Sequence, residues 1–155
     1  MRGCLTKYRA AIPAYCLLLI AYCSFAACSV PNLEPPECDE ARDVVREFYS
    51  LHFGSDMGFS AEGLEKKKIY LTPRLYESLK DSAQAVDPFT RTSDPPKAFR
   101  AGECRVIDPG KRVAFNMLLF WKTDTRSEQR SINVTTAKVD GAWRIDSVDD
   151  APLSN

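Results

Sequence analysis

The sequence predicts an α+β domain in which two to three helices precede a four-stranded antiparallel sheet. Apolar residues recur at helical spacing as far as about residue 86, and they alternate with polar residues from residue 99 onward. Turn-forming residues divide the alternating part, and helices and strands are segregated along the chain, which favours α+β over α/β. The length of 155 residues, with 45% hydrophobic and 27% charged residues, fits one globular domain after a leader.

The first segment has the features of an export signal. The first nine residues carry three basic side chains, no acidic residue occurs before Glu34, and residues 12–27 are almost wholly apolar. That run is shorter than the roughly 20 residues that a membrane-spanning helix needs. We therefore expect a signal peptide over 1–27, with a buried N-terminal helix as the alternative.

The end of this segment resembles a bacterial lipobox. In Phe25-Ala26-Ala27-Cys28, small residues precede a cysteine that would become the lipidated N-terminus, although Phe25 departs from the usual leucine. The expected result is a protein anchored to the membrane through acyl chains on Cys28, in the bacterial envelope and facing the periplasm. By resemblance to bacterial sorting rules, Ser29 favours the outer membrane. A plain signal-peptidase cut after Cys28 is the alternative.

Two cysteines, Cys38 and Cys104, remain beyond the expected signal and lipid site. In an exported domain, such a pair predicts one disulfide. The alternative is metal binding, but the two cysteines have no CxxC spacing and no histidine beside them, so no metal site is expected.

The helical part begins after a proline-rich tether over 28–37, so that the domain would span 38–150. Helical periodicity predicts a first helix over about 39–53, with Asp39 as its N-cap. A short helical segment follows over 64–71. Thr72-Pro73 predicts a further helix start, with an end near Val86, and 87–98 is a proline-rich loop.

The strands follow from turn signals at 108–110, 123–127 and 140–141. We expect four strands, at about 99–107, 113–121, 132–136 and 143–148. The Asp140-Gly141 pair is typical of a two-residue hairpin turn. Its register predicts the cross-strand pairs Lys138–Trp143, Thr136–Ile145, Ala137–Arg144 and Thr135–Asp146. Arg144 and Asp146 would then share one face, either as an exposed ion-pair ladder or as a polar patch in a pocket.

These elements resemble, in their order, the nuclear transport factor 2-like (cystatin-like) superfamily, and more narrowly an uncharacterised family of bacterial envelope lipoproteins. The resemblance covers most of residues 38–149, and it rests on five segments: Cys38 before the first helix, Phe48-Tyr49 with His52 one turn later, Tyr70-Leu71-Thr72, Asp87-Pro88-Phe89-Thr90, and the closing hairpin Asp140-Gly141-Ala142-Trp143-Arg144-Ile145-Asp146-Ser147-Val148. It implies a curved sheet, a cone-shaped fold with a pocket between helix and sheet, and a homodimer through the sheet. It implies no established activity, because the superfamily contains enzymes, transport factors and bacterial immunity proteins.

His52 is the only histidine, which excludes a multi-histidine metal site. Tyr49 lies three residues before it, so one helix face could present a phenol and an imidazole together. His52 either packs near the end of the first helix or lines a pocket as a ligand contact or acid–base group.

Two further positions have both a structural and a functional interpretation. Asp87 before Pro88 favours a turn, and Phe89 could then plug the open end of the cone; alternatively, Asp87 at a pocket mouth could act as a base. Trp121, at the end of the longest expected strand, is either a core residue or a platform for a ligand.

These residues allow three functions. The first is a non-catalytic envelope lipoprotein that binds a small ligand or a periplasmic protein, with Tyr49, His52, Trp121 and Arg144 as contacts. The second is an inhibitor or immunity protein that blocks a periplasmic enzyme. The third is a small hydrolase, isomerase or dehydratase that uses His52, Tyr49, Asp87 or Asp146.

The balance of 21 basic and 21 acidic residues argues against nucleic-acid binding. No phosphate-binding loop or dinucleotide motif occurs, so no cofactor is expected.

Overall fold

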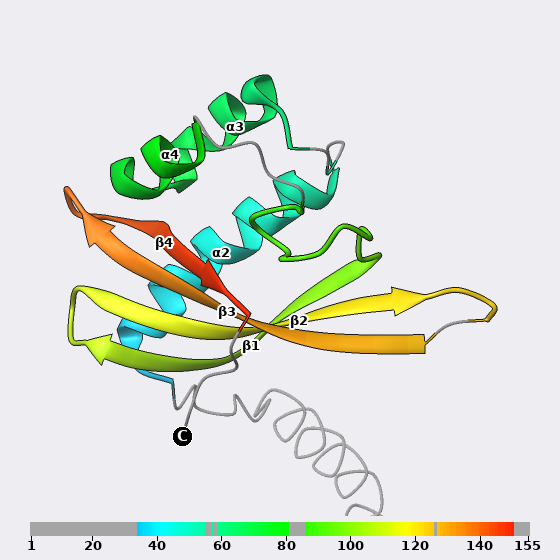
Figure 1. Cartoon of the computed structure of the whole chain (residues 1–155). Helices are drawn as coiled ribbons and strands as arrows, with labels where there is room; N and C mark the ends of the chain where they lie inside the picture. The colour runs from blue at the N-terminus through cyan, green and yellow to red at the C-terminus, as the bar shows by residue number, and fades with distance from the viewer. Residues whose placement is uncertain (1–33, 55–56, 58, 81–85, 126, 151–155) are drawn as a thin grey trace, which may run out of the picture. The chain divides into compact units, whose positions relative to one another are not determined.

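The computed structural model describes residues 34–54, 57, 59–80, 86–125 and 127–150. All of them belong to one compact unit, Glu34–Asn155, so the expected signal over 1–27 and Cys28 lie outside the described residues. The elements are α2 (Pro36–Gly54), α3 (Ala61–Lys67), the 3-10 helix η1 (Lys68–Tyr70), α4 (Pro73–Lys80), β1 (Ala98–Asp108), β2 (Arg112–Lys122), β3 (Ser127–Val139) and β4 (Ala142–Asp149) (Figure 1). The predicted α+β class is confirmed. Within the described ranges, no helix combines the length and the apolar character needed to cross a membrane.

Helix α2 starts earlier than predicted. It begins at Pro36, and the carbonyl of Pro35 accepts hydrogen bonds from the amides of Cys38 (2.9 Å) and Asp39 (3.4 Å). Proline suits the first helical position because its φ is preset and its missing N–H would have no helical partner there. Asp39 is therefore a first-turn residue rather than the predicted N-cap, and the end of the expected tether is helical.

The start of α4 is the predicted one. The Thr72 hydroxyl accepts a hydrogen bond from the Leu75 amide at 3.2 Å, which is the contact expected of an N-cap. The described part of α4 ends at Lys80, and Val86 lies in a bend rather than at a helix end. The predicted end at Val86 was therefore wrong, because Asp87 and Pro88 begin the following turn.

The sheet has the order β1-β2-β3-β4, with all neighbours antiparallel. One face of β2 is fully buried and shares a core with the apolar stripe of α2. The core members from β2 are Val113, Phe115, Met117, Leu119 and Trp121, and those from α2 are Cys38, Ala41, Val45, Phe48 and Tyr49. Beyond β4, the segment before α4 adds a bridge in which Leu71 pairs with Ile145 and the Thr72 amide donates to the Ile145 carbonyl at 2.9 Å.

The β3–β4 hairpin corrects one predicted pair. Asp140 and Gly141 both have positive φ, at 51° and 79°, as a type I′ turn requires, and the first three predicted pairs are present. The register then shifts, so that Thr135 pairs with Ser147. Asp146 is the extra residue of a β-bulge, which turns its side chain away from the face of Arg144. The predicted Thr135–Asp146 pair is therefore wrong, and Asp146 bonds to arginines other than Arg144.

The predicted Cys38–Cys104 disulfide is present, with a Cα–Cα distance of 6.0 Å. It joins the first turn of α2 to β1 next to a second bulge, where the pairing of β1 with β2 shifts between Ala101 and Cys104. The guanidinium of Arg42 donates to the carbonyls of Ala101 (3.0 Å) and Gly102 (2.8 Å). The bulge is thus held to α2 by one covalent bond and two charge-assisted hydrogen bonds.

Gly102 is required by the close approach of β2. A Cβ at this position would lie 2.6 Å from the backbone oxygen of Asn116, which cannot move without disturbing the sheet. We expect Gly102→Ala to lower the free energy of unfolding by about 1–3 kcal/mol, measured by urea denaturation. Gly54→Ala is the matched control, because a Cβ there meets nothing within 4 Å, and it should leave stability unchanged or slightly raised. Equal stability of the two variants would contradict the steric argument.

Candidate functional site

The structure brings three of the predicted site residues together near the C-terminal end of α2. His52 Nε2 lies 2.6 Å from Asp87 Oδ2, and the side chains are only 2% and 11% exposed. The other carboxylate oxygen, Asp87 Oδ1, accepts a hydrogen bond from the Phe89 amide at 2.8 Å. Asp87 therefore closes an Asx-type turn and at the same time binds the imidazole.

The aromatic side chain of Phe89 fills the space that this turn creates. It is 1% exposed, and its ring centroid lies 4.9 Å from Phe48 and 5.3 Å from His52, both in edge-to-face geometry. Tyr49, which is fully buried, donates its hydroxyl to the Phe89 carbonyl at 2.7 Å. The loop that begins at Asp87 is thus fastened to α2 by two side-chain hydrogen bonds and a packed ring.

The chemistry available to this cluster is limited by its burial. The His52 imidazole and the Tyr49 hydroxyl bond to the loop itself, behind the Phe89 ring. A substrate could reach them only after the loop moved away, and general acid–base chemistry requires hydrogen-bond reach to the reacting group. In this closed arrangement, the cluster acts as a fastening between α2 and the loop.

The ionisation of Tyr49 gives a test of this arrangement. Burial, and secondly the nearby Asp87 carboxylate, raise the pKa of Tyr49 well above its ordinary value of 10.0. Below that value the stabilisation by the neutral phenol is fully present, and it is lost as the pH rises through the folded pKa, since the unfolded chain ionises first. We expect Tyr49→Phe to be about 1 kcal/mol less stable at neutral pH and its stability to fall less steeply above about pH 10. Parallel alkaline profiles in urea denaturation would contradict this.

Trp121 and Arg144 are separate from this cluster. The Trp121 indole is 4% exposed, and its Nε1 donates to the Asp94 carbonyl at 3.0 Å, so it braces the later part of the loop. Arg144 lies on the opposite face of the sheet, in register with Ala137. Its Nε atom is buried and has no hydrogen-bond partner among the described residues. The structure therefore does not bring Trp121 and Arg144 into one site with Tyr49 and His52.

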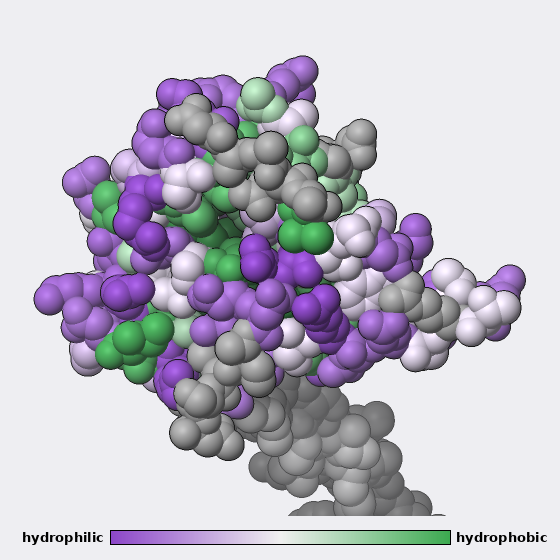
Figure 2. Space-filling model, viewed as in Figure 1, coloured by the Kyte–Doolittle hydropathy of each residue, from purple (hydrophilic) through white to green (hydrophobic). Residues whose placement is uncertain are grey.

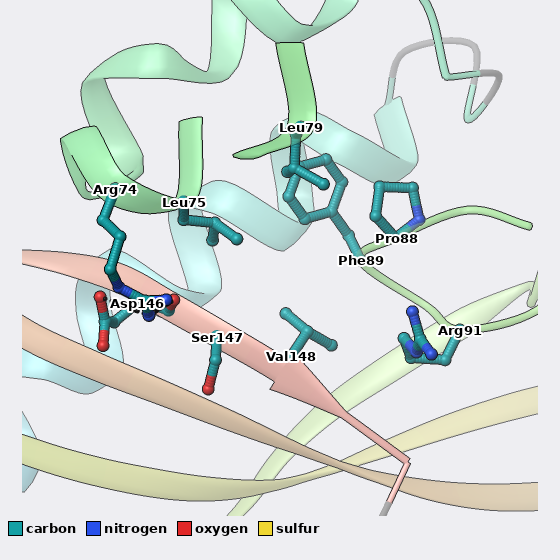
Figure 3. Close-up of a pocket in the computed structure, with 9 residues that line it drawn as sticks. All are labelled: Arg74, Leu75, Leu79, Pro88, Phe89, Arg91, Asp146, Ser147 and Val148. Atoms are coloured by element: carbon teal, nitrogen blue, oxygen red, sulfur yellow. Dashed lines mark hydrogen bonds and ion pairs between the residues drawn. The ribbon is translucent and has the colours of Figure 1, made fainter. Parts of the chain in front are cut away.

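Asp146 lies in a cavity formed by α4, the loop after Val86 and β4 (Figure 3). The cavity has a volume of about 170 Å³, comparable with the roughly 150 Å³ of a cavity that admits benzene. Its apolar lining consists of Leu75, Leu79, Pro88, Phe89 and Val148. Figure 2 shows this region as hydrophobic surface set back between the helices and the sheet, with hydrophilic side chains beside it.

Each end of the cavity carries one carboxylate shared by two arginines. At one end, Asp146 pairs with Arg74 at 3.0 Å and with Arg112 at 3.3 Å, and it accepts the Thr72 hydroxyl at 3.0 Å. Arg74 is fixed further, because it also donates to the Asp146 carbonyl at 2.7 Å. The four guanidinium and carboxylate groups of this end stand in a ratio of two cations to one anion.

At the other end, Asp150 is shared by Arg91 at 3.3 Å and Arg130 at 3.0 Å. Arg91 has a φ of 57°, in the left-handed region that costs a non-glycine residue about 1–2 kcal/mol. Figure 3 shows Arg91 at the end of the cavity opposite Arg74 and Asp146, with the apolar side chains between them.

Sequence reasoning identified Asp146 but missed Arg74 and Arg91. Leu75 and Leu79 have the i, i+4 spacing of a buried stripe, and Arg74 precedes Leu75, so the cavity wall on α4 carried a signal. Arg91 carried none, because arginine is not a residue that favours left-handed backbone. No cluster of three or more His, Cys, Asp or Glu side chains suited to a metal ion occurs in the described part of the chain.

No protein-family model and no curated protein matches this chain. It is similar to the crystal structure of a protein of unknown function from Bacteroides thetaiotaomicron. The two chains are 23% identical, with a TM-score of 0.47, and the match covers 71% of this chain and 88% of that chain.

Proposed function

We propose that this chain is an exported, lipid-anchored and non-catalytic protein of the bacterial envelope that binds a small ligand. The observation that carries the binding function is the cavity of about 170 Å³ between α4, the loop after Val86 and β4. It combines an apolar lining with a few polar groups at its ends, which is the usual construction of a small-molecule site.

Two further observations support the proposal. The groups suited to acid–base chemistry, His52 and Tyr49, are committed to holding the loop, so the cavity wall depends on them without exposing them. The N-terminal features of the sequence supply the export and the anchor, with Cys28 as the lipidated residue. A cone-shaped fold of the nuclear transport factor 2-like type, with the cavity at its mouth, is part of the same proposal.

The first experiment is a native mass spectrum of the protein extracted gently from the envelope of its own host. Two added masses are expected, one covalent from the acyl chains and one non-covalent from the ligand. Leu79→Trp should fill the cavity and remove the non-covalent mass alone, whereas Leu51→Trp, at a position 37% exposed on α2, should keep it. A Cys28→Ser variant should lose the covalent mass alone.

A spectrum in which wild type and Leu79→Trp carry the same masses would contradict ligand binding in this cavity. An added mass made of a second polypeptide would support the inhibitor function instead, and an exact doubling would identify a homodimer.

A further inference from the structure

The charges at the two ends of the cavity identify the kind of ligand that it suits. Arg74, Arg112, Arg91 and Arg130 face only two carboxylates, those of Asp146 and Asp150, so positive charge is in excess at both ends. A ligand that enters between them meets apolar side chains in the middle and unbalanced guanidinium groups at the ends. This arrangement favours an anion with an apolar body over a neutral or cationic compound.

The two ends differ in how firmly their arginines are held. Arg74 donates to both an Asp146 carboxylate oxygen (3.0 Å) and the Asp146 carbonyl (2.7 Å), so its guanidinium is already committed. Among the described residues, Arg91 contacts a carboxylate only through Nε, at 3.3 Å. Asp150, its partner, is closer to Arg130, at 3.0 Å. Arg91 is therefore the better placed of the two to exchange its partner for a ligand.

The backbone at Arg91 is an independent reason to assign it a role. Its φ of 57° is a conformation in which glycine is strongly favoured, yet the position holds a long cationic side chain that lines the cavity. Strained residues of this kind persist where the side chain contributes something that the backbone alone does not require.

We propose that the cavity binds a small organic carboxylate whose apolar body, about the size of one aromatic ring, lies between Leu75, Leu79 and Val148 and whose carboxylate lies against Arg91. The size follows from the volume of about 170 Å³, which admits one ring or a short branched chain but no larger body. This inference rests on the proposed ligand-binding function and specifies the chemical class of the ligand.

The test uses the purified full-length chain with phenylacetate as the probe and phenylacetamide as its neutral isostere, titrated by calorimetry. We expect phenylacetate to bind at least about tenfold more tightly than phenylacetamide. Added sodium chloride should weaken only the phenylacetate complex, because salt screens a partly exposed ion pair.

Three variants locate the charge that matters. Arg91→Gly removes the guanidinium and suits the left-handed backbone, so it should fold normally and lose most of the preference for phenylacetate. Asp150→Asn removes the competing carboxylate and should tighten phenylacetate binding several-fold. Arg46→Gln, at an exposed position of α2, changes the net charge without touching the cavity and should change nothing.

The outcomes separate this inference from the function on which it rests. Equal affinity for phenylacetate and phenylacetamide, or an Arg91→Gly variant that keeps the preference, would overturn the carboxylate assignment. If the host-derived mass still disappears in Leu79→Trp, ligand binding in the cavity stands even so. If neither probe binds and that mass is unaffected, both proposals fail together.

Discussion

His52→Ala is expected to lower the free energy of unfolding by about 3–5 kcal/mol. The substitution removes a buried ring that packs on Phe48 and Phe89, and it takes away the 2.6 Å partner of the Asp87 carboxylate. Because the Asp87 side chain is only 11% exposed, water cannot fully replace the imidazole. The measurement is urea denaturation of the variant beside wild type.

A double-mutant cycle separates the hydrogen bond from the packing. Asp87→Ala and the double variant with His52→Ala complete the cycle, and we expect a coupling energy of about 1–3 kcal/mol. Amide exchange at Phe89 should become faster in either single variant, because Asp87 Oδ1 holds that amide at 2.8 Å. Strictly additive losses, with unchanged exchange at Phe89, would show that His52 contributes by packing alone.

Removal of the disulfide is expected to lower the stability by about 4 kcal/mol. Cys38 and Cys104 are 66 residues apart, and closure of so long a loop restricts the unfolded chain strongly on the chain-entropy account. For a chain of this size, the loss corresponds to a fall in melting temperature of roughly 15 °C. The measurement compares wild type with Cys38→Ser/Cys104→Ser by thermal and urea denaturation.

Reductant supplies the matched control for this prediction. It should lower the stability of wild type to that of the double serine variant and should leave the variant itself unchanged. The urea dependence should also steepen without the disulfide, because a freer unfolded chain exposes more surface. A loss below about 1 kcal/mol would mean that Arg42 and the packed helix already fix the first turn of α2 to the sheet without the covalent bond.

Local chemistry in the sequence predicted the parts of the fold that depend on neighbouring residues. The Thr72 cap, the Asp140-Gly141 turn and the first three pairs of the last hairpin are each specified within a few positions of the chain. The bulge at Asp146 was not predicted, because it depends on partners from far away in sequence. Thr72, Arg74 and Arg112 all bond to its side chain, and two of them precede it by more than 70 residues.

The candidate site was predictable to a smaller extent, for the same reason. Helical spacing placed Tyr49 and His52 on one face of α2, and the Asp-Pro pair predicted a turn at Asp87. Neither pattern could show that the turn folds back onto that helix face and buries both side chains. The cavity formed instead where this loop, α4 and β4 meet, and the position of Arg91 in it depends on a backbone conformation that its residue type disfavours.

The bulge in β1 has a consequence for self-association. As the first strand in the sheet order, β1 is an edge strand, and the backbone groups of an edge can template the addition of a strand from another molecule. Here the Ala101 and Gly102 carbonyls are occupied by Arg42, the local spacing is irregular, and the disulfide anchors the strand to α2. A molecule with a reduced disulfide and no Arg42 side chain would present a flatter edge to its neighbours, and at high concentration it would form β-rich aggregates where the native protein stays dispersed.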